Sequence, residues 1–471
     1  KGEGVSKYKN IYINYFKRTD DYTQGIIFYI KSIKNKQIIS SSYSQNIKNE
    51  NQYQIRFMPD KNEQEITSGN IKATIKTTVA SNEPVELRRL ILENLGNEEE
   101  IVELTGYFEP ILTPKEQYYA HPAFNNLFLV YGYDEKNEAL LVKRKKREIG
   151  EKEVYLATTL HASRENRIGD LEYEIEEEKF MERGNLKIPK MVKDSLPFSK
   201  MIGLVTEPVV AMKRTIKIKK QEKVVIDFIL SVEEEKEQAI QSLEKYSSFE
   251  NVKNEFELSK ARVEAETRYL NIKGKDIEMY QKMLSYIVFD DSIKSVEKER
   301  IKQIQSFKQS DLWRYGISGD LPIILVKMKN ANDVQSLKEV LKAYEYFRTK
   351  NVETEIVIMD EEKYSYENYV REEIDSTILN QHMGYLKNTK GGIFILNEEE
   401  MDKKGRWICA GAKDGGFSGG GSGPAVSLFD PADAWPVSRE QPGDRDPGFC
   451  LDLHLRGYPG GGDPAGFPVC A

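Results

Sequence analysis

The sequence turns on one stretch, residues 311–323, which reads Asp311-Leu312-Trp313-Arg314-Tyr315-Gly316-Ile317-Ser318-Gly319-Asp320-Leu321-Pro322-Ile323. Gly316 and Gly319 can adopt backbone angles that other residues avoid, and Pro322 suits the first turn of a new helix. The pattern therefore predicts a tight loop that places Asp320 at the start of a helix. Trp313 is expected to lie in the core, with this helix cap beneath it.

Two chemical functions are open for this stretch. Asp320 is a candidate catalytic carboxylate, and the turn from Gly316 to Asp320 is a candidate phosphate cradle. A phosphate-binding loop needs a lysine and a wider glycine spacing directly after a strand, and the stretch has neither. We therefore interpret Trp313, Gly316, Gly319 and Asp320 as a structural pivot, and Asp320 as a catalytic acid remains the alternative.

Upstream of the pivot, residues 233–310 carry apolar side chains at helical spacing. A capping box at Ser231-Val232-Glu233-Glu234 predicts the start of the first helix. Gly274 separates the helical segments that follow. The region is therefore expected to form a helical linker.

Downstream of the pivot, helix and strand patterns alternate through residues 311–412. An amphipathic helix is predicted from Val334 to Phe347, with Asn332 or Asp333 as its cap. Two apolar runs, at residues 355–359 and 392–396, predict buried strands, and a second helix is expected between them. The region therefore reads as a small α/β segment.

Residues 1–232 show the short period of β-strands instead. Clear examples are the runs 26–30, 53–57, 71–75 and 216–218. Turn-forming residues separate such runs, for example at 58–60 and at 94–97. Many strands without helices between them predict a large two-sheet sandwich.

One loop of this sandwich is a candidate binding site. It reads Ala120-His121-Pro122-Ala123-Phe124 and follows Tyr118 and Tyr119. A histidine can hydrogen-bond a sugar hydroxyl while a neighbouring aromatic ring stacks on the sugar. His121 can equally be a structural residue under the loop. The candidate carbohydrate-binding residues are His121, Phe124, Tyr118 and Tyr119.

Overall composition narrows the classes of function. The net charge of −7 arises from 69 basic and 76 acidic residues that are mostly interleaved, which argues against a nucleic-acid partner. The basic run from Lys143 to Arg147 is interpreted as the rim of a charged hairpin. No run approaches the roughly 18 apolar residues of a membrane helix. The 3 cysteines form neither a disulfide framework nor a metal pattern, so we predict no metal or cofactor and expect a reducing cytoplasm.

The two ends of the sequence carry signals of their own. Residue 1 is Lys and no leader follows it, so the sequence is expected to begin either after processing or, by preference, inside a longer chain. After Lys413 the residues Lys, Ile, Asn, Met and Thr no longer occur, whereas Gly, Pro, Asp and Ala dominate. Residues 413–471 are therefore predicted to be a disordered tail, and a misjoined reading of the gene would explain their composition.

Several runs resemble the cyclic β-1,2-glucan synthases of bacteria. They are Glu86-Leu87-Arg88-Arg89-Leu90, His121-Pro122-Ala123-Phe124, Asn126-Leu127-Phe128, Arg183-Gly184 and Leu312 to Ile323 of the pivot. The resemblance covers roughly residues 1 to 412. It implies a relation to glycoside hydrolase family 94, whose members have a β-supersandwich, a helical linker and an (α/α)6 barrel. This chain resembles the supersandwich, over residues 1–232, with the helical linker and the α/β segment that follow it. It also implies a parent enzyme of the glycosyltransferase or glycoside phosphorylase type.

Departures from the family pattern bear on activity. The metal-binding aspartates of the family's transferase domain and the Gly-Asp-Trp-Asn-Asp-like motif of its helical barrel do not occur, and Leu321-Pro322 follows Gly319-Asp320. No catalytic residue is carried over. The resemblance therefore implies a non-catalytic segment that binds β-1,2-glucan or oligosaccharide weakly, or acts as a scaffold, beside other domains of its parent. The alternative is a family 94-like β-glucoside phosphorylase or hydrolase with Asp320 or Glu109 as general acid. The expected compartment is the cytoplasm, with the parent anchored to the inner membrane by other segments.

Overall fold

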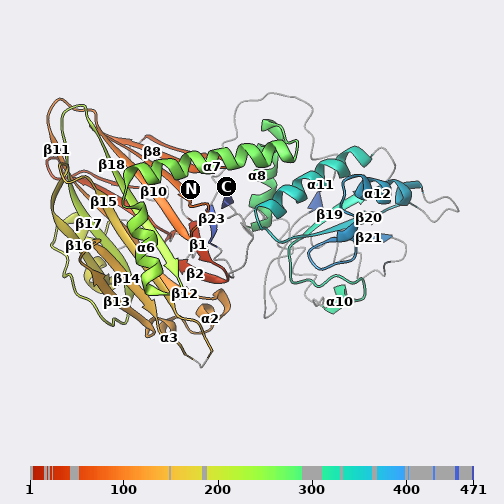
Figure 1. The fold of residues 1–471 in the computed structure, drawn as a ribbon, viewed down its shortest axis with the longest axis horizontal. Helices are drawn as coiled ribbons and strands as arrows, with labels where there is room; N and C mark the ends of the chain where they lie inside the picture. The colour runs from red at the N-terminus through yellow and green to blue at the C-terminus, as the bar shows by residue number, and fades with distance from the viewer. Residues whose placement is uncertain are drawn as a thin grey trace. The chain divides into compact units, whose positions relative to one another are not determined.

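A computed structural model describes most of the chain (Figure 1). The described residues are 4–14, 18–19, 22–23, 25–42, 52–147, 150–182, 188–288, 310–328, 333–362, 369–397, 401, 428–429, 451–455 and 469–470. The chain divides into two compact units. The first, here called the sandwich unit, comprises Lys1–Ala265 and Asp446–Ala471, and the second, here called the α/β unit, comprises Glu266–Arg445.

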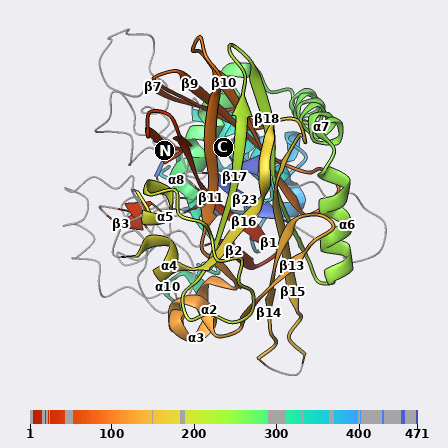
Figure 2. The same ribbon diagram turned by 90° about the vertical axis from the view of Figure 1, so that its left-hand side faces the viewer.

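The larger sheet of the sandwich unit is antiparallel throughout. Its strands follow the order β13-β14-β15-β18-β10-β9-β8-β7. They span Gln52–Phe57 (β7), Asn62–Ser68 (β8), Ile71–Val79 (β9), Val85–Asn94 (β10), Leu129–Asp134 (β13), Ala139–Arg144 (β14), Val154–Ala162 (β15) and Lys223–Glu233 (β18). In β8 and β9 buried and partly exposed residues alternate, because successive side chains of a strand point to opposite faces. Figure 2 shows these long strands side by side.

A second antiparallel sheet faces the first across the main core. It has the order β16-β17-β11-β5-β6, with strands Ile27–Ser32 (β5), Ile38–Ser40 (β6), Glu100–Phe108 (β11), Arg167–Glu176 (β16) and Pro208–Ile218 (β17). Phe28 of β5 meets Phe228 of β18 edge to face, with ring centroids 5.4 Å apart. A Cβ at Gly106 would lie 3.2 Å from the Phe28 ring, so the missing side chain makes room for this aromatic contact. The predicted two-sheet sandwich is confirmed.

Two small sheets complete the described strands of the sandwich unit. One has the order β12-β2-β1-β23-β24, with Gly4–Tyr8 (β1), Ile11–Asn14 (β2), Pro110–Thr113 (β12), Leu451–Leu455 (β23) and Val469–Cys470 (β24). The other pairs Arg18–Thr19 (β3) with Tyr22–Thr23 (β4). The prediction of a disordered tail concerns residues 413–471, of which 428–429, 451–455 and 469–470 are described strands and the rest lie outside the described residues.

Helices follow the sandwich as the linker prediction expects. They are α6 (Lys236–Tyr246), α7 (Phe249–Tyr269) and α8 (Gly274–Val288). α6 packs Ala239, Leu243 and Tyr246 against the outer face of the larger sheet (Figure 1). The predicted capping box at Ser231–Glu234 is wrong, because β18 continues to Glu233 in pairing with β15 and α6 begins at Lys236 without a side-chain cap. Sheet pairing overrides the local helix signal here.

The α/β unit is a parallel sheet with helices. Its strands follow the order β21-β20-β19-β22, with Ile323–Met328 (β19), Glu355–Asp360 (β20), Ile393–Asn397 (β21) and Leu428–Phe429 (β22). The helices described within this unit are α8, α10 (Ser310–Trp313), α11 (Val334–Thr349) and α12 (Tyr369–Asn380), with the short 3-10 helix η3 at Gly384–Leu386. The predicted alternation of helix and strand is present in the described residues.

The pivot differs from its prediction in two respects. Pro322 precedes strand β19 and not a helix, so Asp320 caps no helix. The side chain of Trp313 is 63% exposed and therefore lies outside the core. The apolar residues that do anchor the stretch are Leu312 and Ile317, which pack on Ile323 and Phe394 in the core of the α/β unit.

Candidate functional site

The predicted carbohydrate loop consists of two short helices, α2 (Lys115–Ala120) and α3 (Pro122–Asn126). His121 lies between them with the non-helical angles φ −152° and ψ 77°. The residue before a proline is pushed out of helical geometry, and Pro122 itself starts α3 at a position where its missing N–H costs nothing. The His-Pro pair therefore breaks the chain into two helices at His121.

Asn125 fastens α3 to the sandwich. Its side-chain amide donates a hydrogen bond to the carbonyl of Ile111, at 2.9 Å, and its oxygen accepts one from Nε of Arg144, at 3.3 Å. Asn125 and Arg144 are both buried. Because buried amides and guanidinium groups need partners, these bonds fix α3 against β12 and β14.

An aromatic and cationic surface lies beside this anchor. The ring of Phe124 is 46% exposed and meets Phe128 edge to face, with centroids 5.1 Å apart. The guanidinium of Arg147 lies 5.2 Å from the centroid of Phe124 and 5.7 Å from that of Phe128. His121 and Leu127 are exposed next to them in the sequence. We call His121, Phe124, Leu127, Phe128 and Arg147 the Phe124 surface.

Charge around the Phe124 surface is held in place by Glu151. Partial burial raises the pKa of the Glu151 carboxyl, but hydrogen bonds from the Arg147 backbone N–H and the Arg144 side chain outweigh it, and the net pKa is lowered. Glu151 therefore binds Arg144 and the backbone of Arg147 as a carboxylate. The guanidinium of Arg147 stays over the aromatic rings.

The four predicted binding residues have different positions. His121 and Phe124 are exposed, as a contact with sugar requires. Tyr118 is buried, so its ring presents no face for stacking, which corrects the expectation for that residue. The side chain of Tyr119 lies outside the described residues.

Sequence reasoning missed Arg147 and Phe128. The basic run at residues 143–147 is predicted to form a hairpin rim. Its first two residues end β14, which pairs with β13 from Asp134↔Ala139 to Leu129↔Arg144. Extending that register by one residue places Phe128 opposite Lys145, and the Lys145 N–H donates to the Phe128 carbonyl at 2.9 Å. The strand pairing was the signal that could have linked the two segments.

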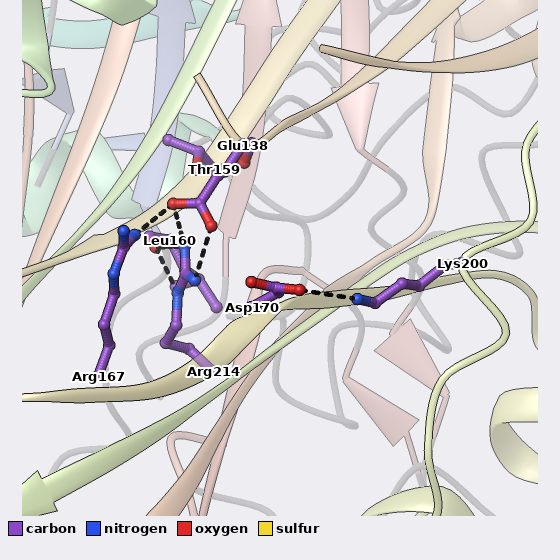
Figure 3. Close-up of polar contacts among 7 residues, drawn as sticks. All are labelled: Glu138, Thr159, Leu160, Arg167, Asp170, Lys200 and Arg214. Atoms are coloured by element: carbon purple, nitrogen blue, oxygen red, sulfur yellow. Dashed lines mark hydrogen bonds and ion pairs between the residues drawn. The ribbon is translucent and has the colours of Figure 1, made fainter. Parts of the chain in front are cut away.

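A buried polar network joins the two main sheets elsewhere (Figure 3). Arg214 of β17 is almost fully buried and contacts both carboxylate oxygens of Glu138 at 3.2 Å, while it also donates to the carbonyl of Leu160. Arg167 of β16 pairs with the same carboxylate. Burial raises the pKa of Glu138, but the two arginines outweigh it and the net pKa is lowered. The nearby Asp170 and Lys200 pair at 3.8 Å on the surface, where such pairs contribute little.

The network also affects His161 of β15. Burial lowers the pKa of His161, and the charges of Arg214 and Arg167 lower it further. The imidazole ring packs on Phe249, with centroids 4.8 Å apart. Each described cation of the network faces a carboxylate or carbonyl of the fold, so we interpret it as a link between sheets and not as a ligand site.

The run Glu86–Leu90 is structural. Arg89 donates two hydrogen bonds to Asp227, both at 2.8 Å, and a third to the carbonyl of Phe249 at 2.6 Å. Glu86 pairs with Arg88 and accepts a hydrogen bond from Ser6. These contacts hold β1 and the start of α7 on the larger sheet. The Arg183-Gly184 pair lies outside the described residues.

At the pivot, the glycines have the predicted role and Asp320 a different one. Gly316 and Gly319 adopt left-handed angles, with φ of 76° and 70°. The Asp320 carboxylate accepts a hydrogen bond from Lys390 at 3.0 Å. The loop before β19 is thereby joined to the loop before β21.

In the described part of the chain no group of three or more His, Cys, Asp or Glu side chains is placed to hold a metal ion. None of the helices seen there has the length and apolar composition that crossing a membrane requires.

Comparisons with known proteins give a consistent result. The family profile described as "Glycosyl hydrolase 94, supersandwich domain" matches residues 1–249. The cyclic beta-(1,2)-glucan synthase NdvB of Rhizobium meliloti (strain 1021) is 26% identical over 351 residues, which cover 74% of this chain and 12% of that protein. The chain thus spans a small part of that relative's length.

Two solved structures show partial similarity to the chain. A bacterial glucoamylase complexed with acarbose aligns at a TM-score of 0.36 and 11% identity, over 60% of this chain and 40% of its own. A polysaccharide lyase aligns at a TM-score of 0.29 and 14% identity, over 49% of this chain and 30% of its own.

Proposed function

The chain belongs to the glycosyl hydrolase 94 supersandwich family through residues 1–249, and from this premise we propose that it is a non-catalytic, glucan-binding segment of a larger glucan synthase-like protein. The ligand we propose is β-1,2-glucan or an oligosaccharide of the same linkage. The relative named for cyclic β-(1,2)-glucan synthesis supports that choice. The compartment we propose is the cytoplasm.

The observation that carries the proposal is the Phe124 surface. Its exposed ring offers an apolar face to the C–H groups of a pyranose, while the imidazole of His121 and the guanidinium of Arg147 offer hydrogen bonds to hydroxyls. The rings lie on the outside of the fold, and such a shallow contact suits a polymer that has to slide. We therefore expect weak binding, with a dissociation constant near the millimolar range, or about −4 kcal/mol.

The absence of catalysis is also part of the proposal. Hydrolysis or phosphorolysis of a glycoside needs two carboxylates, or a carboxylate and a phosphate site, on either side of one bond. Glu109 accepts a hydrogen bond from the hydroxyl of Tyr107 at 3.2 Å in the sandwich unit, whereas Asp320 pairs with Lys390 in the α/β unit. Each carboxylate thus has a partner within the fold, and the two lie in different units.

The test uses the full chain and β-1,2-glucan. Ligand-observed NMR with linear and cyclic β-1,2-glucan should show saturable binding, and Phe124→Ala and His121→Ala should each weaken it several-fold. Tyr369→Ala, which removes an exposed ring of the α/β unit, is the matched control and should leave that binding unchanged. Incubation with glucan and phosphate should release no glucose 1-phosphate.

Three outcomes would overturn the proposal. Binding that ignores both substitutions would move the site away from the Phe124 surface. Phosphorolysis that Asp320→Asn abolishes would establish an enzyme. The absence of both binding and turnover would leave a scaffolding role, in which the segment positions other domains of its parent.

A further inference from the structure

The α/β unit exposes two large aromatic rings close to the start of its strands. Trp313 is 63% exposed, and Tyr385 is 70% exposed. Aromatic rings have apolar faces that can stack on a ligand, and exposure to this degree leaves those faces accessible. Trp313 ends α10, and Tyr385 lies in η3, in the two loops that lead into β19 and β21 (Figure 1).

A hydrogen bond holds each of the two rings in place. The indole N–H of Trp313 donates to the carbonyl of Ser318 at 3.2 Å. The guanidinium of Arg348 donates to the hydroxyl of Tyr385 at 3.1 Å and lies 5.7 Å from the centroid of its ring. These bonds limit the rotamers of two exposed side chains before any ligand arrives. A ligand that stacks on them therefore loses less entropy on binding.

A series of contacts connects these two hydrogen bonds through Glu355, the first residue of β20. The buried carboxylate of Glu355 accepts hydrogen bonds from the Ser318 hydroxyl and the Gly391 N–H, each at 3.3 Å. The hydroxyl of Tyr344 donates to the Gly391 carbonyl, and the Tyr344 ring also lies 5.8 Å from Arg348. The rings thus belong to one organised edge of the sheet. We call residues 313–322, Glu355 and residues 384–392 the amino edge.

The amino edge also carries charged groups within reach of solvent. Asp320 and Lys390 pair at 3.0 Å, and both side chains remain partly exposed. Their pairing joins the two loops, with Gly316 and Gly391 in left-handed angles of 76° and 69° at the bends. A carboxylate and an ammonium together can accept and donate hydrogen bonds to neighbouring hydroxyls.

We propose that the amino edge is a second carbohydrate-contact surface, at which Trp313 and Tyr385 stack on glucose rings while Asp320 and Lys390 bind hydroxyls. The identity of the sugar rests on the proposed function, whereas the surface rests on its own contacts. Separate rings with charged groups among them suit a polyhydroxylated chain with apolar ring faces. A protein partner would favour a contiguous apolar centre with a polar rim.

The proposal differs from the usual ligand site of an open parallel sheet, which lies at the carboxyl ends of the strands. Its support is therefore the exposed, pre-oriented side chains and not the fold. Glu355 has a supporting role, because it is buried beneath the edge and orients Ser318 and Gly391.

A site-specific test follows from the tryptophan content. The chain has 3 Trp, so 5-fluorotryptophan labelling gives few 19F NMR signals, and Trp313→Phe assigns the one at the amino edge. Titration of the labelled full chain with short linear β-1,2-linked glucose oligosaccharides should shift the Trp313 signal saturably. Tyr385→Ala should weaken that binding about fivefold to tenfold, in line with the loss of one stacking ring.

Two controls separate this inference from the proposed function. Phe124→Ala should leave the midpoint of the Trp313 titration within about twofold of the unmodified chain, and so should Tyr369→Ala, another exposed tyrosine of the α/β unit. Thermal melting of each variant checks its fold.

If the Trp313 signal does not shift while Phe124-dependent binding occurs, this inference alone is overturned. If the Trp313 signal does not shift and no binding is detected by any method, both this inference and the proposed function are overturned. If the Trp313 signal shifts with the same midpoint in the Tyr385→Ala variant, Tyr385 is not part of the site. Saturable movement of Trp313 without any effect of Phe124→Ala on total binding would retain the inference and overturn the Phe124 surface.

Discussion

The pair of Arg89 and Asp227 gives the sharpest prediction about stability. Arg89 binds both oxygens of Asp227 at 2.8 Å, and the two side chains are 12% and 1% exposed. Burial raises the pKa of Asp227, and the charge and hydrogen bonds of Arg89 oppose that rise. Arg89→Met keeps an apolar stem but leaves a carboxylate buried without its cation. Removing one partner of a buried ion pair costs about 3 to 5 kcal/mol.

The same substitution releases the start of α7. Arg89 also donates to the Phe249 carbonyl at 2.6 Å, and that acceptor loses its partner in the variant. Urea denaturation at pH 7 should therefore show a free energy of unfolding lower by about 3 to 5 kcal/mol. The deficit should shrink at acidic pH, because protonation of the unpaired Asp227 removes the buried charge.

Two further variants isolate the cause. Asp227→Asn in the Arg89→Met background should recover part of the loss, since it removes the uncompensated charge at nearly constant volume. Arg56→Met breaks an ion pair with Glu63 at 2.9 Å in which Arg56 is 47% exposed, and it should cost no more than about 1 kcal/mol. The reasoning fails if Arg89→Met costs no more than Arg56→Met, or if the double variant is no more stable than the single one.

Three other predictions test separate parts of the structure. Burial raises the pKa of the Glu233 carboxyl to about 7; the charge of Lys9 opposes this rise and the charge of Glu234 adds to it. The contribution of Glu233 to the free energy of unfolding is therefore full below about pH 4.5 and is lost as the pH rises to about 7. We expect this loss of stability to be about 1 to 2 kcal/mol after allowance for the partial exposure of Glu233. Glu233→Gln should remove most of the loss, so a pH profile of urea midpoints that is the same in the variant would contradict the prediction. Gly106→Val should cost about 1 to 3 kcal/mol in urea denaturation because its side chain collides with Phe28, whereas Gly132→Val, where an added Cβ would meet its nearest side-chain atom at 3.9 Å, should be tolerated. Trp313→Ala should lower the free energy of unfolding by less than about 1 kcal/mol, because the ring is exposed. A loss of about 3 kcal/mol or more would indicate that the ring is packed in the core.

Local pattern was sufficient for the regular parts of the chain. Alternating residues in β8 and β9 indicated strands because a two-residue period buries one face, and the apolar spacing of α11 indicated a helix because it lines one side. The helix predicted from Val334 to Phe347 runs from Val334 to Thr349. The strands predicted at 355–359 and 392–396 are β20 and β21 with shifts of one residue at their ends.

Tertiary pairing decided what pattern could not. Strand β19 follows Pro322, where a proline had suggested a helix start, and its apolar run is stabilised by β20 on one side. Ser231 to Glu233 carries a capping signal but continues β18, because β15 supplies its hydrogen bonds. The hydrogen bonds of a neighbouring strand stabilise this segment more than a helix cap would, and a single sequence does not reveal which strand is the neighbour.

The candidate site was predicted only in part. His121 and Phe124 were found because their residue types suggest sugar contact, and both are exposed. Tyr118 carries the same signal but faces the interior, and Arg147 reaches Phe124 through a hairpin pairing that the residue types alone do not reveal. Trp313 was placed in the core because tryptophan usually is, whereas its exposure depends on Leu312 and Ile317 filling that core.

The most direct test of the central claim is a titration of the full chain with β-1,2-glucan, followed by NMR in the presence of phosphate. The account predicts saturable binding near the millimolar range that Phe124→Ala weakens, with no glucose 1-phosphate formed over the course of the experiment. Release of glucose 1-phosphate, or saturable binding that Phe124→Ala leaves unchanged, would contradict it.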